Sequence, residues 1–235
     1  MFVREGLELA IQDGCDLRAR IGGVSRSRLL RRAWRPAGRT PGKIRRSLDP
    51  QHVAQLESAL WMSYYRREWT RFLRVALAVM RDVFGLPWAS TARGSWFLLR
   101  ATRLWSPDPD NDPPAARVAM ERFYRVLKQH TEGPFDPAEV ARLEVEWWRI
   151  HRVHQHTNAS SDGRALVDAL AALYAYAFDV PETTVRRAAE QRALAMRFCD
   201  QWVRAGCDPE SSLVSQKREA LVRSYASLVA AVQRA

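Results

Sequence analysis

The stretch DPAEVARLEVEWWRIHRVHQH, residues 136–156, is typical of one complete amphipathic α-helix. Asp136 and Glu139 have the spacing of a capping box, in which side chains satisfy backbone N–H groups at the helix start, and Pro137 suits the first helical position. Apolar residues then recur at spacings of three and four, which places them on one face of the helix. The stretch therefore predicts a helix that begins at about Pro137 and ends at about His156.

The same signals recur on both sides of this helix. Starts carry a capping Asp, a Pro or both, and most ends carry Gly or Pro. These signals predict helices over about residues 49–84, 90–105, 112–130, 136–156, 164–178, 181–206 and 208–233. The sequence has no alternating strand pattern and no Asn-Gly hairpin signal. The predicted fold class is therefore all-α, a single globular bundle of about seven helices joined by short loops over residues 49–235.

Residues 1–48 differ from the rest of the chain in composition. Residues 17–46 contain eleven Lys and Arg and no Asp or Glu. The whole chain has 37 Lys and Arg against 26 Asp and Glu, so removing these eleven leaves 26 basic residues against 26 acidic ones. Gly and Pro are scattered among the arginines, which is typical of disordered segments. We therefore expect a flexible basic extension over residues 1–48, and the chain outside residues 17–46 has no net charge.

This basic extension has three interpretations. It is a solvated tail, or the translation product of GC-rich DNA upstream of the true start codon, or an arm that binds an anionic partner. In the last case, residues 17–46 would contact nucleic acid, an acidic protein or an anionic membrane surface. The candidate contact residues are Arg26, Arg28, Arg31, Arg32 and Arg35. Only three of the 37 basic residues are Lys. This bias is typical of a high-GC bacterium and weakens the arginine count as evidence for phosphate binding.

Four ionisable residues lie on predicted apolar helix faces. Glu144, His151 and His154 follow the apolar stripe of the helix over residues 136–156, and Glu68 lies in the stripe of the first helix. Such groups are costly to bury unless they are paired. Metal ligation would pair them, and Glu and His side chains suit iron, manganese or zinc. One hypothesis is therefore a metal or cofactor site in an aromatic-lined pocket, built from these four residues.

The alternative is that inward glutamates pair with inward arginines, whose planar guanidinium binds a carboxylate through two bonds. The carboxylates are Glu57, Glu68 and Glu144, and the candidate partners are Arg67, Arg71 and Arg192. The sequence contains no Glu-x-x-His, HExxH, CxxC, P-loop or GxGxxG motif. No motif therefore specifies a reaction, and the choice between metal and arginine depends on where these side chains lie.

The remaining composition bears on the class of protein. Nine tryptophans are many for this length, and they fill a core more often than they line a pocket. Three cysteines without ligand spacing indicate reduced thiols. No apolar run reaches the roughly 18 residues of a membrane span and no signal peptide is recognised, so we expect a cytoplasmic protein. The long first helix also offers a surface for a homodimer.

The sequence as a whole favours a non-catalytic binding or interaction module, because it contains no catalytic motif. Two alternatives stay open. One is a helical enzyme that uses the Glu/His site with a metal or cofactor, and the other is a nucleic-acid-associated protein that acts through the basic extension.

Overall fold

The computed structural model describes residues 49–131, 133–156 and 163–234. Every regular element in these segments is helical, with no strand, which confirms the all-α fold class. The elements are α2 (Pro50–Tyr65), α3 (Trp69–Ala78), the π-helical turn η1 (Val79–Val83), α4 (Trp88–Trp105), α5 (Pro113–Lys128), α6 (Pro137–His156), α7 (Arg164–Phe178), α8 (Glu182–Arg204) and α9 (Ser212–Arg234). The basic extension over residues 1–48, with its candidate contacts Arg26, Arg28, Arg31, Arg32 and Arg35, lies outside the described residues.

Three helices begin at the predicted Asp-Pro signals. The Asp49 carboxylate accepts a hydrogen bond from the Gln51 N–H at 3.0 Å, and Asp112 accepts one from the Ala115 N–H at 3.0 Å. At α6, Asp136 Oδ1 accepts from the backbone N–H groups of Ala138 and Glu139, both at 3.0 Å. Each cap is worth about 1 kcal/mol to its helix.

The prediction of one continuous helix over residues 49–84 was wrong. The helix stops at Tyr65, Arg67 takes a positive φ of 55°, and α3 starts in a new direction at Trp69. The Arg67 guanidinium donates to Ser106 Oγ at 2.6 Å, beyond the end of α4. This contact holds a backbone conformation that a non-glycine residue rarely adopts. The break lets α3 pack against α4.

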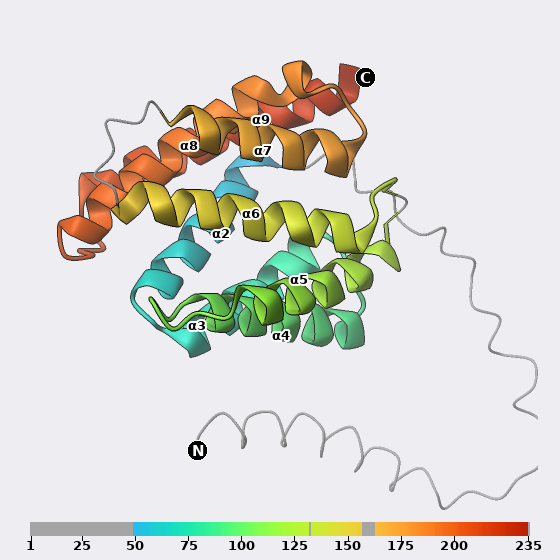
Figure 1. The fold of residues 1–235 in the computed structure, drawn as a ribbon, viewed down its shortest axis with the longest axis horizontal. Helices are drawn as coiled ribbons and strands as arrows, with labels where there is room; N and C mark the ends of the chain where they lie inside the picture. The colour runs from blue at the N-terminus through green and yellow to red at the C-terminus, as the bar shows by residue number, and fades with distance from the viewer. Residues whose placement is uncertain (1–48, 132, 157–162, 235) are drawn as a thin grey trace, which may run out of the picture. The chain divides into compact units, whose positions relative to one another are not determined.

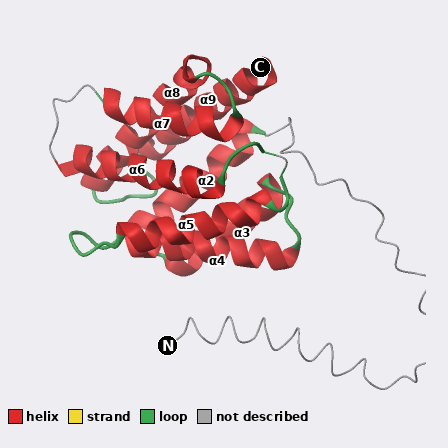
Figure 2. Ribbon diagram, turned by 45° about the vertical axis from the view of Figure 1, so that its right-hand side comes forward, coloured by secondary structure: helices red, strands yellow, loops and turns green. Residues whose placement is uncertain are grey.

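The helices form two groups, and helices α2 and α6 lie between these groups (Figure 1). In one group, α8 packs against both α7 and α9; in the other, α4 packs against α3 and α5. Helix α6 contacts α5 on one side and α7 on the other, while α2 contacts α3 and α9. Figure 2 shows the same order from a second direction. Helices α2 and α6 thus join the two groups, and their facing surfaces become walls of the site described below.

None of the helices in the described segments combines the length and the apolarity of a membrane-spanning helix.

Candidate functional site

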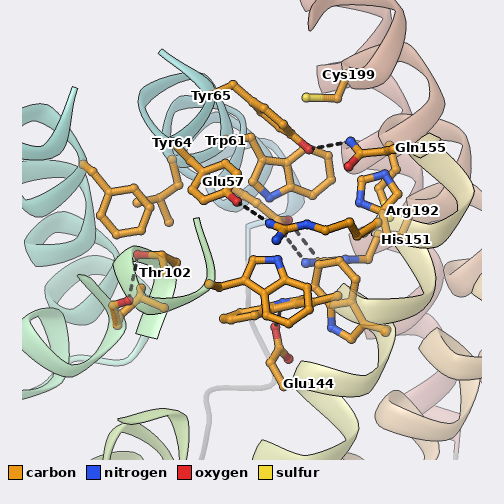
Figure 3. Close-up of a pocket in the computed structure, with 18 residues that line it drawn as sticks. Glu57, Trp61, Tyr64, Tyr65, Thr102, Glu144, His151, Gln155, Arg192 and Cys199 are labelled. Atoms are coloured by element: carbon orange, nitrogen blue, oxygen red, sulfur yellow. Dashed lines mark hydrogen bonds and ion pairs between the residues drawn. The ribbon is translucent and has the colours of Figure 1, made fainter. Parts of the chain in front are cut away.

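A pocket of about 180 Å³ lies between α2, α4, α6 and α8 (Figure 3). Aromatic side chains supply much of its wall, including Trp61, Tyr64, Tyr65, Trp105, Trp147 and Trp148. These four tryptophans therefore line a pocket as well as contributing to the core, whereas Trp202 is fully buried outside it. A cavity of about 150 Å³ is sufficient for benzene. The pocket is thus large enough for a molecule built on one ring.

A buried ion pair between α2 and α8 forms the polar centre of this pocket. The Arg192 guanidinium binds the Glu57 carboxylate through two hydrogen bonds, and Tyr225 Oη donates to Glu57 Oε2 at 2.6 Å. The side chains of Arg192 and Glu57 are only 13% and 11% exposed, respectively. Burial disfavours the charged guanidinium, but Glu57, together with Tyr174, Tyr225 and Glu144, outweighs it and raises the Arg192 pKa well above its ordinary value. The predicted pairing of an inward glutamate with Arg192 is confirmed.

Arg192 is also enclosed by aromatic rings. Its guanidinium carbon lies 5.6 Å from the ring centroids of both Trp61 and Trp147, within range of a cation–π interaction. Nη1 additionally donates to Tyr174 Oη at 3.3 Å. Figure 3 shows the side chain extending across the pocket toward Glu57, beside Trp61. These contacts fix the guanidinium in one orientation.

Two buried donors at this centre have no acceptor among the described residues. They are the Arg192 Nε–H and the Trp147 Nε1–H, and both residues line the pocket. A buried donor left without an acceptor costs about 1 to 3 kcal/mol. The two donors are close together, because the Arg192 guanidinium carbon lies 5.6 Å from the Trp147 ring centroid.

Glu144, a predicted site residue, lies in the pocket wall on α6. Tyr124 Oη donates to its Oε2 at 3.0 Å and Trp148 Nε1 donates to its Oε1 at 3.2 Å. Burial raises the Glu144 pKa above its ordinary value, although Arg192 and these donors oppose the shift. The nearby Trp147 indole also lowers the Glu144 pKa, but the Trp147 N–H does not meet the geometry of a hydrogen bond to the Glu144 carboxylate. Glu144 is thus a second carboxyl close to the ion pair.

His151, the other predicted residue in this pocket, belongs to a network across three helices. Its Nε2 lies 3.1 Å from Asp200 Oδ2 on α8. Gln155 Nε2 donates to Asp200 Oδ1 at 2.6 Å and to Tyr65 Oη at 3.0 Å, which links α6 to α2 (Figure 3). Burial raises the Tyr65 pKa well above its ordinary value, so the phenol keeps its proton. Asp200 fixes the orientation of the imidazole.

The other two predicted residues lie elsewhere. Glu68 precedes α3, and its carboxylate pairs with Arg66 at 2.8 Å and with Arg71 at 3.2 Å. His154 lines a separate cleft near the start of α7. The structure therefore brings Glu144 and His151 to one pocket and leaves Glu68 and His154 outside it. Within the described segments, no three His, Cys, Asp or Glu side chains gather in a way that would hold a metal ion.

Both cations of the pocket wall already have partners, which disfavours binding of an anion. Arg192 pairs with Glu57. Arg152 donates to Tyr64 Oη at 3.3 Å and lies 3.9 Å from Asp108 Oδ1, and Glu144 is a further carboxyl group in the wall. No protein family, no curated protein and no solved structure matches the chain. The function is therefore inferred from the chemistry of the pocket itself.

Proposed function

We propose that the pocket between α2, α4, α6 and α8 binds a small, planar, uncharged molecule with a hydrogen-bond acceptor such as a carbonyl oxygen. One observation carries the proposal: two buried donors, Arg192 Nε–H and Trp147 Nε1–H, lack acceptors in an aromatic-lined pocket. A carbonyl oxygen has two lone pairs and accepts from both. Each bond contributes about 0.5 to 1.5 kcal/mol, so the acceptor gives both affinity and orientation.

The walls support a flat, uncharged ligand. Trp61, Trp105 and Trp148 offer ring surfaces that favour contact with another flat apolar group. A ligand carboxylate would add a negative charge near Glu57 and Glu144, and like charges at short range disfavour ionisation of the group or its binding. A neutral acceptor satisfies the same two donors without this cost.

Three probes of similar size test the proposal in isothermal titration calorimetry at neutral pH. Acetophenone has the ring and the carbonyl, ethylbenzene has the ring alone, and benzoate has the ring with a charge. Two hydrogen bonds of the usual strength predict that acetophenone binds at least about fivefold more tightly than ethylbenzene. Benzoate is expected to bind more weakly than acetophenone. Equal affinities for acetophenone and ethylbenzene, or tightest binding of benzoate, would contradict the proposal.

A pair of Trp→Phe variants locates the interaction. Trp147→Phe removes the unpaired indole N–H but keeps an aromatic ring, so the preference for acetophenone over ethylbenzene should fall by about three- to tenfold. Trp202→Phe is the matched control, because its indole N–H donates to the Asp208 carbonyl oxygen at 2.7 Å and lies outside the pocket. The control should keep the wild-type preference. A Trp147→Phe variant with an unchanged preference would place the acceptor elsewhere.

A further inference from the structure

A second cavity of about 360 Å³ adjoins the aromatic pocket. Its walls come from η1 and from helices on both sides of the bundle and are mainly hydrocarbon, including Val79, Leu127, Leu173, Phe178, Leu228 and Val232. We call it the apolar chamber. It has about twice the volume of the aromatic pocket.

The two cavities meet at the polar centre. Glu57, Leu60, Leu98, Glu144 and Arg192 line both of them. A ligand atom held by the unpaired N–H groups of Arg192 and Trp147 therefore lies beside this shared wall, of which Arg192 is a part. The leucines in this shared wall provide an apolar boundary between the two spaces.

The polar groups that reach the apolar chamber already have partners. Tyr124 Oη donates to Glu144, Tyr225 Oη donates to Glu57, and Tyr174 Oη accepts from Arg192. Burial raises the pKa of all three phenols, so they stay neutral. Thr131 Oγ1 is likewise bound to the Leu127 carbonyl oxygen. What the chamber offers a ligand is therefore chiefly hydrocarbon surface.

We infer that the ligand of the aromatic pocket carries a hydrocarbon chain, and that this chain occupies the apolar chamber. The ligand class is then a flat carbonyl compound with an alkyl or isoprenoid tail, its carbonyl at Arg192 and Trp147. If each chain carbon takes about the 30 Å³ of a water molecule, the chamber holds on the order of ten carbons. The inference rests on the proposed function, because it places the carbonyl at the two unpaired donors.

A homologous series of alkyl phenyl ketones tests this inference on the full chain by calorimetry. Acetophenone, butyrophenone, hexanophenone and octanophenone share the ring and the carbonyl and differ only in chain length. Each methylene buried in apolar surroundings strengthens binding by about fourfold. We therefore expect the dissociation constant to fall by about fourfold per added methylene until the chamber is filled.

Ala177 lines the apolar chamber and does not line the aromatic pocket, so Ala177→Phe fills the chamber selectively. This variant should bind acetophenone like the wild type but gain little affinity from octanophenone. Ala226→Phe, the same substitution at an exposed position of α9, is the matched control and should keep the full gain. Val229→Phe, on the α9 wall of the chamber, repeats the test at a second position.

The possible results separate the two proposals. If acetophenone shows its preference over ethylbenzene but longer chains bind no more tightly, the inference is overturned and the proposed function stands. If the chain-length gain survives in both chamber-filling variants, the chain lies elsewhere and the inference is again overturned. If no ketone binds to the wild type, both proposals fail.

Discussion

Replacing Arg192 with Met is expected to lower the free energy of unfolding by about 3 to 5 kcal/mol. The variant keeps much of the hydrocarbon volume but leaves the Glu57 carboxylate buried, 11% exposed, with the Tyr225 hydroxyl as its remaining hydrogen-bond donor. An uncompensated buried charge of this kind is among the most costly single changes in a protein core.

The double variant Glu57→Leu with Arg192→Met separates this cost from the value of the pair. Replacing both partners of a buried ion pair by apolar residues is often close to neutral. Here the Tyr174 and Tyr225 hydroxyls also lose partners, at about 1 kcal/mol each. The double variant should therefore recover at least about 1 kcal/mol relative to Arg192→Met alone.

Urea unfolding of the wild type, both single variants and the double variant, followed by far-ultraviolet circular dichroism, measures these differences. If the double variant loses the sum of the two single losses, Glu57 and Arg192 act independently. The buried ion pair would then not be the polar centre of the pocket.

Three further outcomes are expected. Because burial raises the Glu144 pKa above 4.5, its contribution to stability is complete below about pH 4.5 and is lost as the pH rises through the raised pKa. Glu144→Gln should remove this part of the pH dependence, so identical urea-unfolding profiles from pH 4 to 8 would contradict it. Trp202→Phe should lower the free energy of unfolding by about 1 kcal/mol more than Trp147→Phe does, because of these two residues only Trp202 has a protein acceptor for its N–H. Thermal and urea unfolding of both variants measure this difference. Burial raises the Cys199 pKa to about 12, so iodoacetamide at pH 8 should modify Cys199 only after unfolding. The partly exposed Cys207 should react in the native state. Peptide mass spectrometry measures the modification of both residues, and rapid native modification of Cys199 would refute the burial argument.

The starts of α2, α5 and α6 were predictable from the sequence because their signals are local, whereas α9 begins at Ser212, four residues after the predicted start. The carboxylate of Asp136 caps residues two and three positions away, so its role needs no knowledge of the rest of the chain. The break after α2 was not predictable in this way. No Gly or Pro stands between Tyr65 and Trp69, and the positive φ of Arg67 is supported by Ser106, 39 residues further along.

The site was predicted only in part. Glu144 and His151 are seven residues apart on α6, which places both on the face that lines the pocket. Glu68 was expected beside them on the assumption of a continuous first helix, and the break moves it away. Asp200 was missed, although its spacing of four from Met196 and seven from Ala193 puts it on the buried stripe of α8.

The unpaired donors had no sequence signal at all. Every Trp and Arg has N–H groups, and only the tertiary arrangement decides which of them find acceptors. Glu68, Glu144, His151 and His154 do not meet in one pocket, and metal binding by Glu144 and His151 stays a prediction. The same holds for nucleic-acid, acidic-partner or membrane contact through residues 17–46, because these residues are not among those described.

The indole N–H resonance of Trp147 tests the central claim most directly. In a ¹H–¹⁵N spectrum, this resonance is identified by its loss in Trp147→Phe, and the Trp202 resonance is identified in the same way. Saturating acetophenone should move the Trp147 resonance downfield, as expected when a free N–H gains an acceptor, while Trp202 stays in place and ethylbenzene causes no downfield shift. An unchanged Trp147 resonance in the presence of bound acetophenone would contradict the assignment of this pocket.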